Sequence, residues 1–346
     1  MSRSSLEILP EEIVLKIFAY LETKDLGRCL QVSKRFRNIA QDESLWNKFE
    51  LENKIFRSKF IGQALRYGLN ELHLEKCRLK FVPLKLPKRN KLQSLYFSAP
   101  WNPQLGDNYE LEFLSNLISS CHFLKKLIIG KYWGQGSNYF GPHPGGLDLK
   151  IIAQNGHTLQ VLNLTNIKLN FDFGEIKAIV DSCTELEELC IHKSNGRALI
   201  DDGLNYLCRN LTRKMRKLHL LKLQDNHLEM LTKQCNQLTL LSLGQVTVSN
   251  IGLNFIIQNL AETLETLVTV TWPYEQAELV EKLPKLKFLY FTDTWHIGKQ
   301  LKEKFKRHRP ELFVMRKNFL VDMKSIGFTI PDVVVKEPCK KRRRIM

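Results

Sequence analysis

Apolar residues follow two different patterns along the chain, one in the first 50 residues and another after residue 69. In residues 9–21, LPEEIVLKIFAYL, apolar side chains recur every three or four positions, which predicts a helix with one apolar stripe. Pro10 suits the first helical position, and the two glutamates after it complement the helix dipole. Thr23 and Ser33 can cap two further short helices. We therefore expect a small helical module with more apolar surface than it can bury alone.

The second pattern is a hexamer of the form Leu-x-x-Leu-x-Leu, which recurs nine times at spacings of 20 to 35 residues. This spacing brackets the period of leucine-rich repeats, which the hexamers resemble. Alternate residues of a strand face opposite sides, so the leucines should fill a core and the residues between them should line a concave sheet. The hexamers begin at Leu69, Leu92, Leu124, Leu159, Leu186, Leu218, Leu238, Leu264 and Leu286, and Arg309, Leu312 and Val314 form a degenerate last repeat.

Three cysteines support this repeat register. Cys121, Cys183 and Cys235 each lie three residues before the first leucine of a hexamer. We expect these thiols to fill small buried gaps at the ends of convex helices and not to bind metal. Residues 201–207 and 250–256 have similar sequences and are predicted to be equivalent helical segments.

Around residues 9–46 the sequence resembles the F-box. The resemblance rests on Leu9-Pro10-x-Glu12-Ile13, Ile17-Phe18-x-x-Leu21, Asp25-Leu26, Val32-Ser33-Lys34-x-Phe36, Ala40 and Leu45-Trp46. It implies binding to the Skp adaptor and, through it, to the cullin and RING protein of an SCF ubiquitin ligase. By position, the residues that would form or support the adaptor contact are Leu9, Pro10, Ile13, Leu26, Cys29, Val32, Lys34 and Trp46. The side chains expected only in the core are Ile17, Phe18, Leu21, Phe36 and Ile39.

These patterns predict an α/β protein with a helical F-box followed by a solenoid that carries parallel strands on its concave face and helices on its convex face. The expected divisions are residues 1–50 for the F-box, 51–68 for a linker helix, 69–325 for the solenoid and 326–346 for a flexible basic tail.

Candidate target-binding residues lie on the expected concave face and along one rim. The concave candidates are His73, Tyr96, Asn163, His192, Lys222 and Tyr290, and the rim candidates are Trp101, Trp133, Tyr139 and Trp295. Aromatic side chains on Gly- and Pro-rich loops are favoured anchors in interfaces. The alternative is that the rings fold back over the ends of the repeats, which is the reading we favour for Trp272.

The positive net charge of the chain adds two candidate partners, an import receptor and nucleic acid. The chain carries a formal charge of +16, and its last residues include five consecutive basic side chains, Lys340, Lys341, Arg342, Arg343 and Arg344. This run is typical of a nuclear-import signal read by an import receptor, so we expect a protein of nucleus and cytoplasm, with the nucleus favoured. The alternative function is a nuclear binding or scaffold protein whose basic repeats and tail contact nucleic acid.

Motifs of enzymatic chemistry were also sought in the sequence. It contains no GxxxxGK[ST], GxSxG, HExxH or CxxC, and no apolar stretch that would span a membrane. We therefore expect an adaptor with no catalytic residues, no cofactor and no metal. The expected function is to recruit an unknown target protein for ubiquitination by proximity to its partners.

Overall fold

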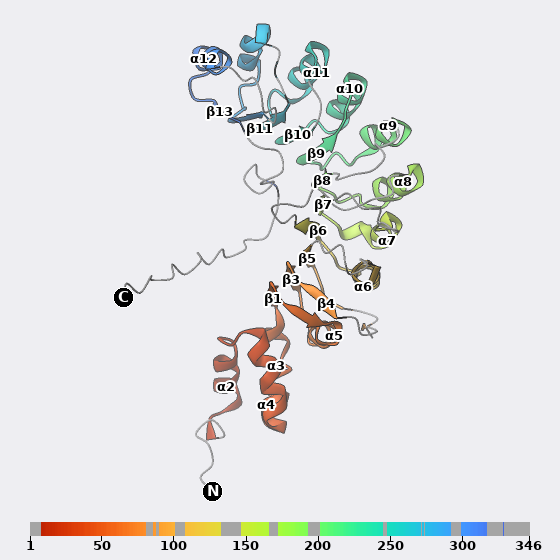
Figure 1. The fold of residues 1–346 in the computed structure, drawn as a ribbon, viewed down its shortest axis with the longest axis vertical. Coiled ribbons are helices and arrows are strands. Elements are labelled where there is room, and N and C mark those ends of the chain that lie inside the picture. Colours follow the sequence, from red (N-terminus) through yellow and green to blue (C-terminus); the bar gives the residue numbers. More distant parts are fainter. Residues whose placement is uncertain are drawn as a thin grey trace, which may run out of the picture.

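The computed structural model describes residues 8–80, 86–87, 90–100, 108–132, 147–165, 172–192, 201–244, 248–270, 272, 274–291, 299–316 and 328. The chain starts as a helical module and continues as an arc. In Figure 1 the strands line the inner side of this arc and the helices lie along its outer side. The predicted fold class is confirmed.

From residue 8 on, where the structure describes it, the helical module holds α2 (Glu11–Phe18), α3 (Thr23–Val32), α4 (Lys34–Ala40) and the 3-10 helix η1 (Glu43–Trp46). Two caps explain where elements begin. The Ser33 hydroxyl accepts from the Phe36 amide at the start of α4, and the Asp42 carboxylate accepts from the Ser44 amide at the start of η1. The Phe18 and Phe36 rings meet edge to face at 5.3 Å between centroids and join α2 to α4.

One parallel sheet runs the length of the arc, and neighbouring strands follow each other in chain order. Its strands are β1 (Lys48–Glu52), β3 (Glu71–Glu75), β5 (Ser94–Pro100), β6 (Lys126–Tyr132), β7 (Val161–Thr165), β8 (Glu188–His192), β9 (Lys217–Leu221), β10 (Leu240–Gly244), β11 (Thr266–Thr269), β12 (Phe288–Phe291) and β13 (Phe313–Arg316). A second, two-stranded sheet pairs β2 (Ile55–Arg57) with β4 (Arg78–Lys80).

Helices form the outer layer because each strand must cross over before it can pair in parallel with the next. They are α5 (Ser58–Arg66), α6 (Asn108–Ser119), α7 (Leu149–Ala153), η2 (Gly156–Thr158), α8 (Phe173–Ser182), α9 (Asp201–Asn210), α10 (Asp225–Gln234), α11 (Asn250–Leu260), η3 (Tyr274–Lys282) and α12 (Lys299–His308). The repeat leucines fill the space between the layers: Leu72, Leu95 and Leu127 are fully buried and aligned on adjacent strands.

The cysteines predicted to pack at helix ends do so. Cys183 and Cys235 are the C-cap residues of α8 and α10, and Cys121 follows α6 by two positions. All three are buried, and burial raises the pKa of each thiol to about 12. They are therefore neutral packing groups at physiological pH.

The two helical segments predicted to be equivalent are the starts of α9 and α11. Each has glycine at its third residue, and a Cβ at either position would meet a side chain of the preceding helix. At Gly203 it would lie 2.6 Å from Ile176 Cδ1, and at Gly252 it would lie 2.8 Å from Leu228 Cδ1. Glycine at this slot lets consecutive helices pack closely.

The structure differs from the sequence prediction at two strands of the sheet, β1 and β9. Residues 51–68, predicted as a linker helix, hold the end of β1, then β2, then α5. The strand β1 pairs in register with β3, so the sheet begins one strand before the first leucine hexamer. The leucine hexamer is not recognisable at β1 because Phe49, which aligns with Leu72, stands where its second leucine is expected.

The second difference is a register error at β9. Leu218 aligns with Leu241, the second leucine of its hexamer, so the first apolar position of this repeat is the buried Met215 and not Leu218. The prediction that Lys222 lies on the concave strand is therefore wrong. Lys222 follows β9 as an exposed residue with a φ of 59°. The physical reason is that two hexamers overlap here, Met215-x-x-Leu218-x-Leu220 and Leu218-x-x-Leu221-x-Leu223, and only packing against the neighbouring strands selects the first.

Candidate functional site

Two helices of the module, α2 and α3, expose apolar side chains. On α2, Val14 and Phe18 are buried, whereas Ile13 and Ile17 are 39% and 38% exposed. At the end of α3, Val32 is 66% exposed. Ile13 and Ile17 are four residues apart and share one side of α2, next to the side that packs inward. The prediction that Ile17 belongs to the core is therefore wrong, since Val14 and Phe18 fill that space. Exposed apolar surface of this kind marks an interaction site.

The eight residues predicted to form or support the adaptor contact differ in burial. Leu26 and Trp46 lie in the core and can only support the surface. The other six reach the surface at least in part: Leu9, Pro10, Ile13, Cys29, Val32 and Lys34. Arg35, which the sequence did not single out, fixes the chain before α2. Its guanidinium donates to the Leu9 carbonyl oxygen.

Trp46 connects the helical module to the solenoid. Its indole Nε1 donates to the Ala40 carbonyl oxygen at 2.7 Å, and its ring lies 5.1 Å from that of Tyr67 and 6.3 Å from that of Phe60. Phe60 belongs to α5, the first helix of the outer layer. A fully buried tryptophan with a satisfied N–H is therefore shared by the two parts of the chain.

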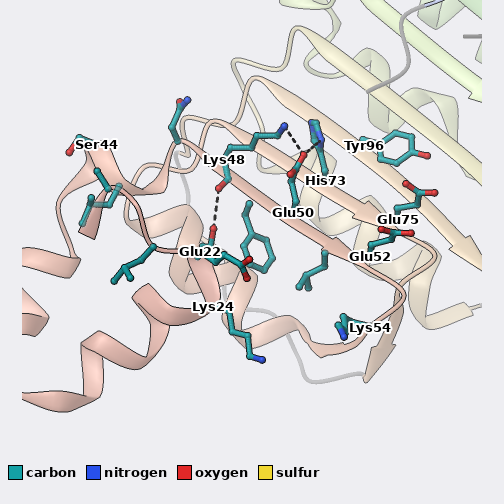
Figure 2. A pocket seen from close by; sticks show the side chains of 17 residues that line it. Glu22, Lys24, Ser44, Lys48, Glu50, Glu52, Lys54, His73, Glu75 and Tyr96 are labelled. Carbon is teal, nitrogen blue, oxygen red and sulfur yellow. Dashed lines mark hydrogen bonds and ion pairs between the residues drawn. The ribbon is translucent and has the colours of Figure 1, made fainter. Parts of the chain in front are cut away.

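A pocket of about 750 Å³ lies where the module meets the sheet, and Figure 2 shows its lining. Two predicted residues come together here. His73 of β3 and Tyr96 of β5 are aligned on adjacent strands, with their rings 6.1 Å apart. Side chains of both charges surround them: Glu22, Glu50, Glu52 and Glu75, and Lys24, Lys48 and Lys54. The charges of both signs give the pocket a polar, mixed character.

The two predicted side chains in this pocket have shifted pKa values. Burial, assisted by the Lys48 ammonium, lowers the pKa of His73, although the carboxylates of Glu50 and Glu71 oppose this. The imidazole is therefore neutral at pH 7, and its Nδ1 lies 3.1 Å from the Glu50 carboxylate. Burial raises the pKa of Tyr96 to about 12, so its phenol is neutral as well.

One row of aligned side chains runs along the whole concave face and includes the His73 and Tyr96 side chains of the pocket. The row runs Glu50, His73, Tyr96, Ile128, Asn163, Cys190, His219, Ser242, Val268, Tyr290 and Met315 across successive strands. It contains the predicted candidates His73, Tyr96, Asn163 and Tyr290. From Asn163 to Tyr290 its members are no more than 6% exposed.

Sequence reasoning missed one member of this row, His219, because of the register error at β9. Its side chain is fully buried, and its Nδ1 lies 2.8 Å from the Ser242 hydroxyl of the next strand. Shifting the repeat so that Met215 is its first apolar residue would have placed His219 on the concave row.

The other predicted residues have different outcomes. Trp272 folds back as expected: it is 5% exposed, donates from Nε1 to the Gln276 carbonyl oxygen at 2.9 Å and packs on Phe305. His192 lies in β8 opposite Thr165. The residues outside the described part of the chain are Trp101, Trp133, Tyr139, Trp295 and the basic run from Lys340 to Arg344.

Among the residues that the structure describes, no three or more His, Cys, Asp or Glu side chains gather as a metal site. None of the helices in this part of the chain is long and apolar enough to cross a membrane.

Comparison with known proteins identifies the helical module. Residues 6–52 match the family model described as F-box-like. The human F-box/WD repeat-containing protein 8 is 36% identical over 83 residues, 24% of this chain and 13% of that protein. Its rat counterpart is 53% identical over 70 residues, 20% of this chain and 11% of that protein. The Xenopus laevis F-box/LRR-repeat protein 5 is 47% identical over 45 residues, 13% of this chain and 7% of that protein.

The N-terminal module is therefore an F-box-like domain, as the sequence predicted, and the names of these relatives combine an F-box with WD repeats or with leucine-rich repeats. The chain spans 13% or less of the length of the relatives named.

Proposed function

We propose that this chain is the substrate-recognition subunit of an SCF ubiquitin ligase. Its F-box-like domain binds a Skp adaptor, and its solenoid holds a target protein for ubiquitination. F-box proteins typically act as adaptors, and the proximity they provide is a sufficient mechanism for that role. The observation that carries the proposal is the exposure of Ile13, Ile17 and Val32 on a domain that matches the F-box-like family.

These exposed apolar side chains would be more stable against a protein partner than in water. Val32 contributes an apolar side chain that is 66% exposed, and burying it is worth on the order of 1–2 kcal/mol. Beneath the surface the module is firmly built, because Leu26, Phe18 and Trp46 fill its core. A rigid apolar surface requires little ordering when a partner binds, which favours affinity.

The proposal is tested with two charge substitutions, Ile13→Asp and Val32→Asp, and one matched control. The control is Ile251→Asp, which alters a similarly exposed isoleucine, 59% exposed, on the outer helix α11. Adaptor binding is measured with purified full-length chain by surface plasmon resonance, and association with the cullin by co-purification.

We expect both F-box variants to lose at least about tenfold in adaptor affinity, because a charge would be desolvated at the interface, while the control binds normally. Melting temperatures should stay close to that of the wild type, since neither side chain is in the core. Unchanged adaptor and cullin association in both variants would refute the proposal.

The identity and location of the target are part of the same proposal. Proximity labelling with proteasome inhibited, using wild type and the Val32→Asp variant, should find targets that stay labelled and rise in abundance when docking is lost. We further propose that the chain enters the nucleus through its basic tail. Replacing residues 340–344 by alanine should move a fluorescent fusion to the cytoplasm, and unchanged nuclear signal would contradict this.

A further inference from the structure

One residue beyond the last strand lies on the concave face. Phe328, twelve positions after the end of β13, is 3% exposed. It belongs to an apolar cluster with Cys190, Leu240, Val268 and Tyr290, which is separate from the main core between sheet and helices. The other members of this cluster come from strands β8, β10, β11 and β12. The phenyl ring is thus buried against the concave side of the sheet, and we call the residues of this cluster, together with His219, the Phe328 pocket.

The floor of this pocket suits an aromatic ring. The His219 imidazole meets the Phe328 ring edge to face, with centroids 6.3 Å apart and planes at 87°. The hydrogen bond between His219 and Ser242 satisfies polar atoms that would otherwise be costly to bury there. The flanking side chains of Val268 and Tyr290 are apolar or present a ring.

The solenoid core is complete without Phe328. The leucines of β9 to β12, such as Leu218, Leu241 and Leu289, are fully buried in the main cluster, on the opposite side of the sheet. The phenyl ring therefore covers a surface and does not close the core. Removing it would expose an apolar patch on the concave face, the kind of feature that marks a protein interaction site.

We propose that this concave pocket binds an aromatic side chain presented by an extended segment of a partner protein, and that Phe328 fills it in the free chain. The proposal rests on the target-receptor function above and names the chemistry of the target. In the structure the Phe328 ring is buried at this place, its edge-to-face partner is His219, and it belongs to one apolar cluster with residues of the concave face. A partner segment must displace an occupant tethered to the same chain, so it must compete with a millimolar effective concentration.

The experiment uses full-length protein and a fluorescent peptide with the sequence of residues 322–332, DMKSIGFTIPD. Its binding is measured by fluorescence anisotropy to the wild type, to Phe328→Ala and to a matched control, Phe123→Ala. Phe123 is 53% exposed and lies outside the cluster, before β6. A second peptide carries alanine in place of phenylalanine.

We expect the phenylalanine peptide to bind Phe328→Ala at least about tenfold more tightly than it binds the wild type or the control, because the internal competitor is gone. The alanine peptide should bind none of the three. Adding Val268→Lys to Phe328→Ala should abolish binding by placing an ammonium in the pocket. Equal affinity for wild type and Phe328→Ala, or equal binding of both peptides, would overturn the proposal.

A second variant covers loss of stability. Phe328→Leu keeps the pocket filled with an aliphatic side chain, and it should give a peptide affinity between those of the wild type and Phe328→Ala. If this folded variant binds the peptide no better than the wild type does, the proposal is also overturned. Adaptor binding is measured on the same samples. If the chain still binds the adaptor but no variant binds the peptide, this inference alone is removed. Adaptor binding by the F-box variants tests only the proposed function.

Discussion

Glu175 lies in the first turn of α8 with its side chain inside the protein. It is 6% exposed, and its Oε2 atom has no hydrogen-bond partner among the residues described. Burial, followed by the nearby carboxylates of Asp172 and Asp148, raises the pKa of Glu175 to about 7 from an ordinary value of 4.5. The folded chain therefore binds this proton more strongly than the unfolded chain does.

The size of the effect follows from linkage. Between the two pKa values the unfolded state holds fewer protons at this site than the folded state, so the free energy of unfolding falls as pH rises from about 4.5 to about 7. With these values, ionisation of Glu175 costs the fold about 1 kcal/mol at pH 5 and about 3 kcal/mol at pH 8. The Glu175→Gln variant carries no ionisable group at this position and escapes the cost.

We expect Glu175→Gln to be more stable than the wild type at pH 8, and the advantage to shrink by about 2 kcal/mol at pH 5. Urea unfolding followed by circular dichroism at both pH values measures this difference. Glu112→Gln, on an exposed position of α6, is the matched control. If the stability difference between Glu175→Gln and the wild type is the same at pH 5 and pH 8, the reasoning about this buried carboxyl is wrong.

Three further predictions concern packing. Gly252→Ala should destabilise the solenoid by about 1–3 kcal/mol because its Cβ would lie 2.7–2.8 Å from side-chain atoms of α10. The control Gly174→Ala, at an exposed position of α8, should be neutral or stabilising. Thermal melts of both variants check this. Trp46→Phe should cost about 1–3 kcal/mol by leaving the buried Ala40 carbonyl oxygen without its donor, and an unchanged melting temperature would contradict this. Cys235 should resist a thiol reagent at pH 8 until the protein unfolds, since its pKa is raised to about 12 by burial; fast labelling of the native protein, read by mass spectrometry, would disagree.

Much of the architecture could be predicted because the repeat leucines carry a strong periodic pattern. The cysteine positions at helix ends and the equivalence of α9 and α11 follow from the same pattern. The register of β9 could not be chosen from local sequence, since two leucine hexamers overlap there. Only pairing with β8 and β10 places His219, and not Lys222, on the concave row.

The exposed apolar residues of α2 show a different limit of prediction from sequence. A stripe of apolar residues on α2 does not say which members face inward, because Ile13, Val14, Ile17 and Phe18 together cover a wide arc. The neighbouring helix decides this by burying Phe18 against Phe36. The Phe328 pocket was beyond sequence reasoning for another reason: it joins residues that are far apart in the chain and share no repeat position.

The pairing of β1 with β3 has a consequence for geometry in the proposed complex. The F-box-like match ends at residue 52, where β1 ends, so the docking domain and the solenoid share a strand. Strands in a sheet are spaced about 4.8 Å apart, and six such steps from β1 to β9 place His219, the ring partner of Phe328, about 30 Å along the sheet. The number of strands in between therefore sets the distance from the F-box-like domain to this part of the concave face. Inserting or deleting one repeat between β1 and β9 would leave both binding surfaces intact. It would change which lysines of a bound target come within reach of the ubiquitin-conjugating enzyme that carries ubiquitin.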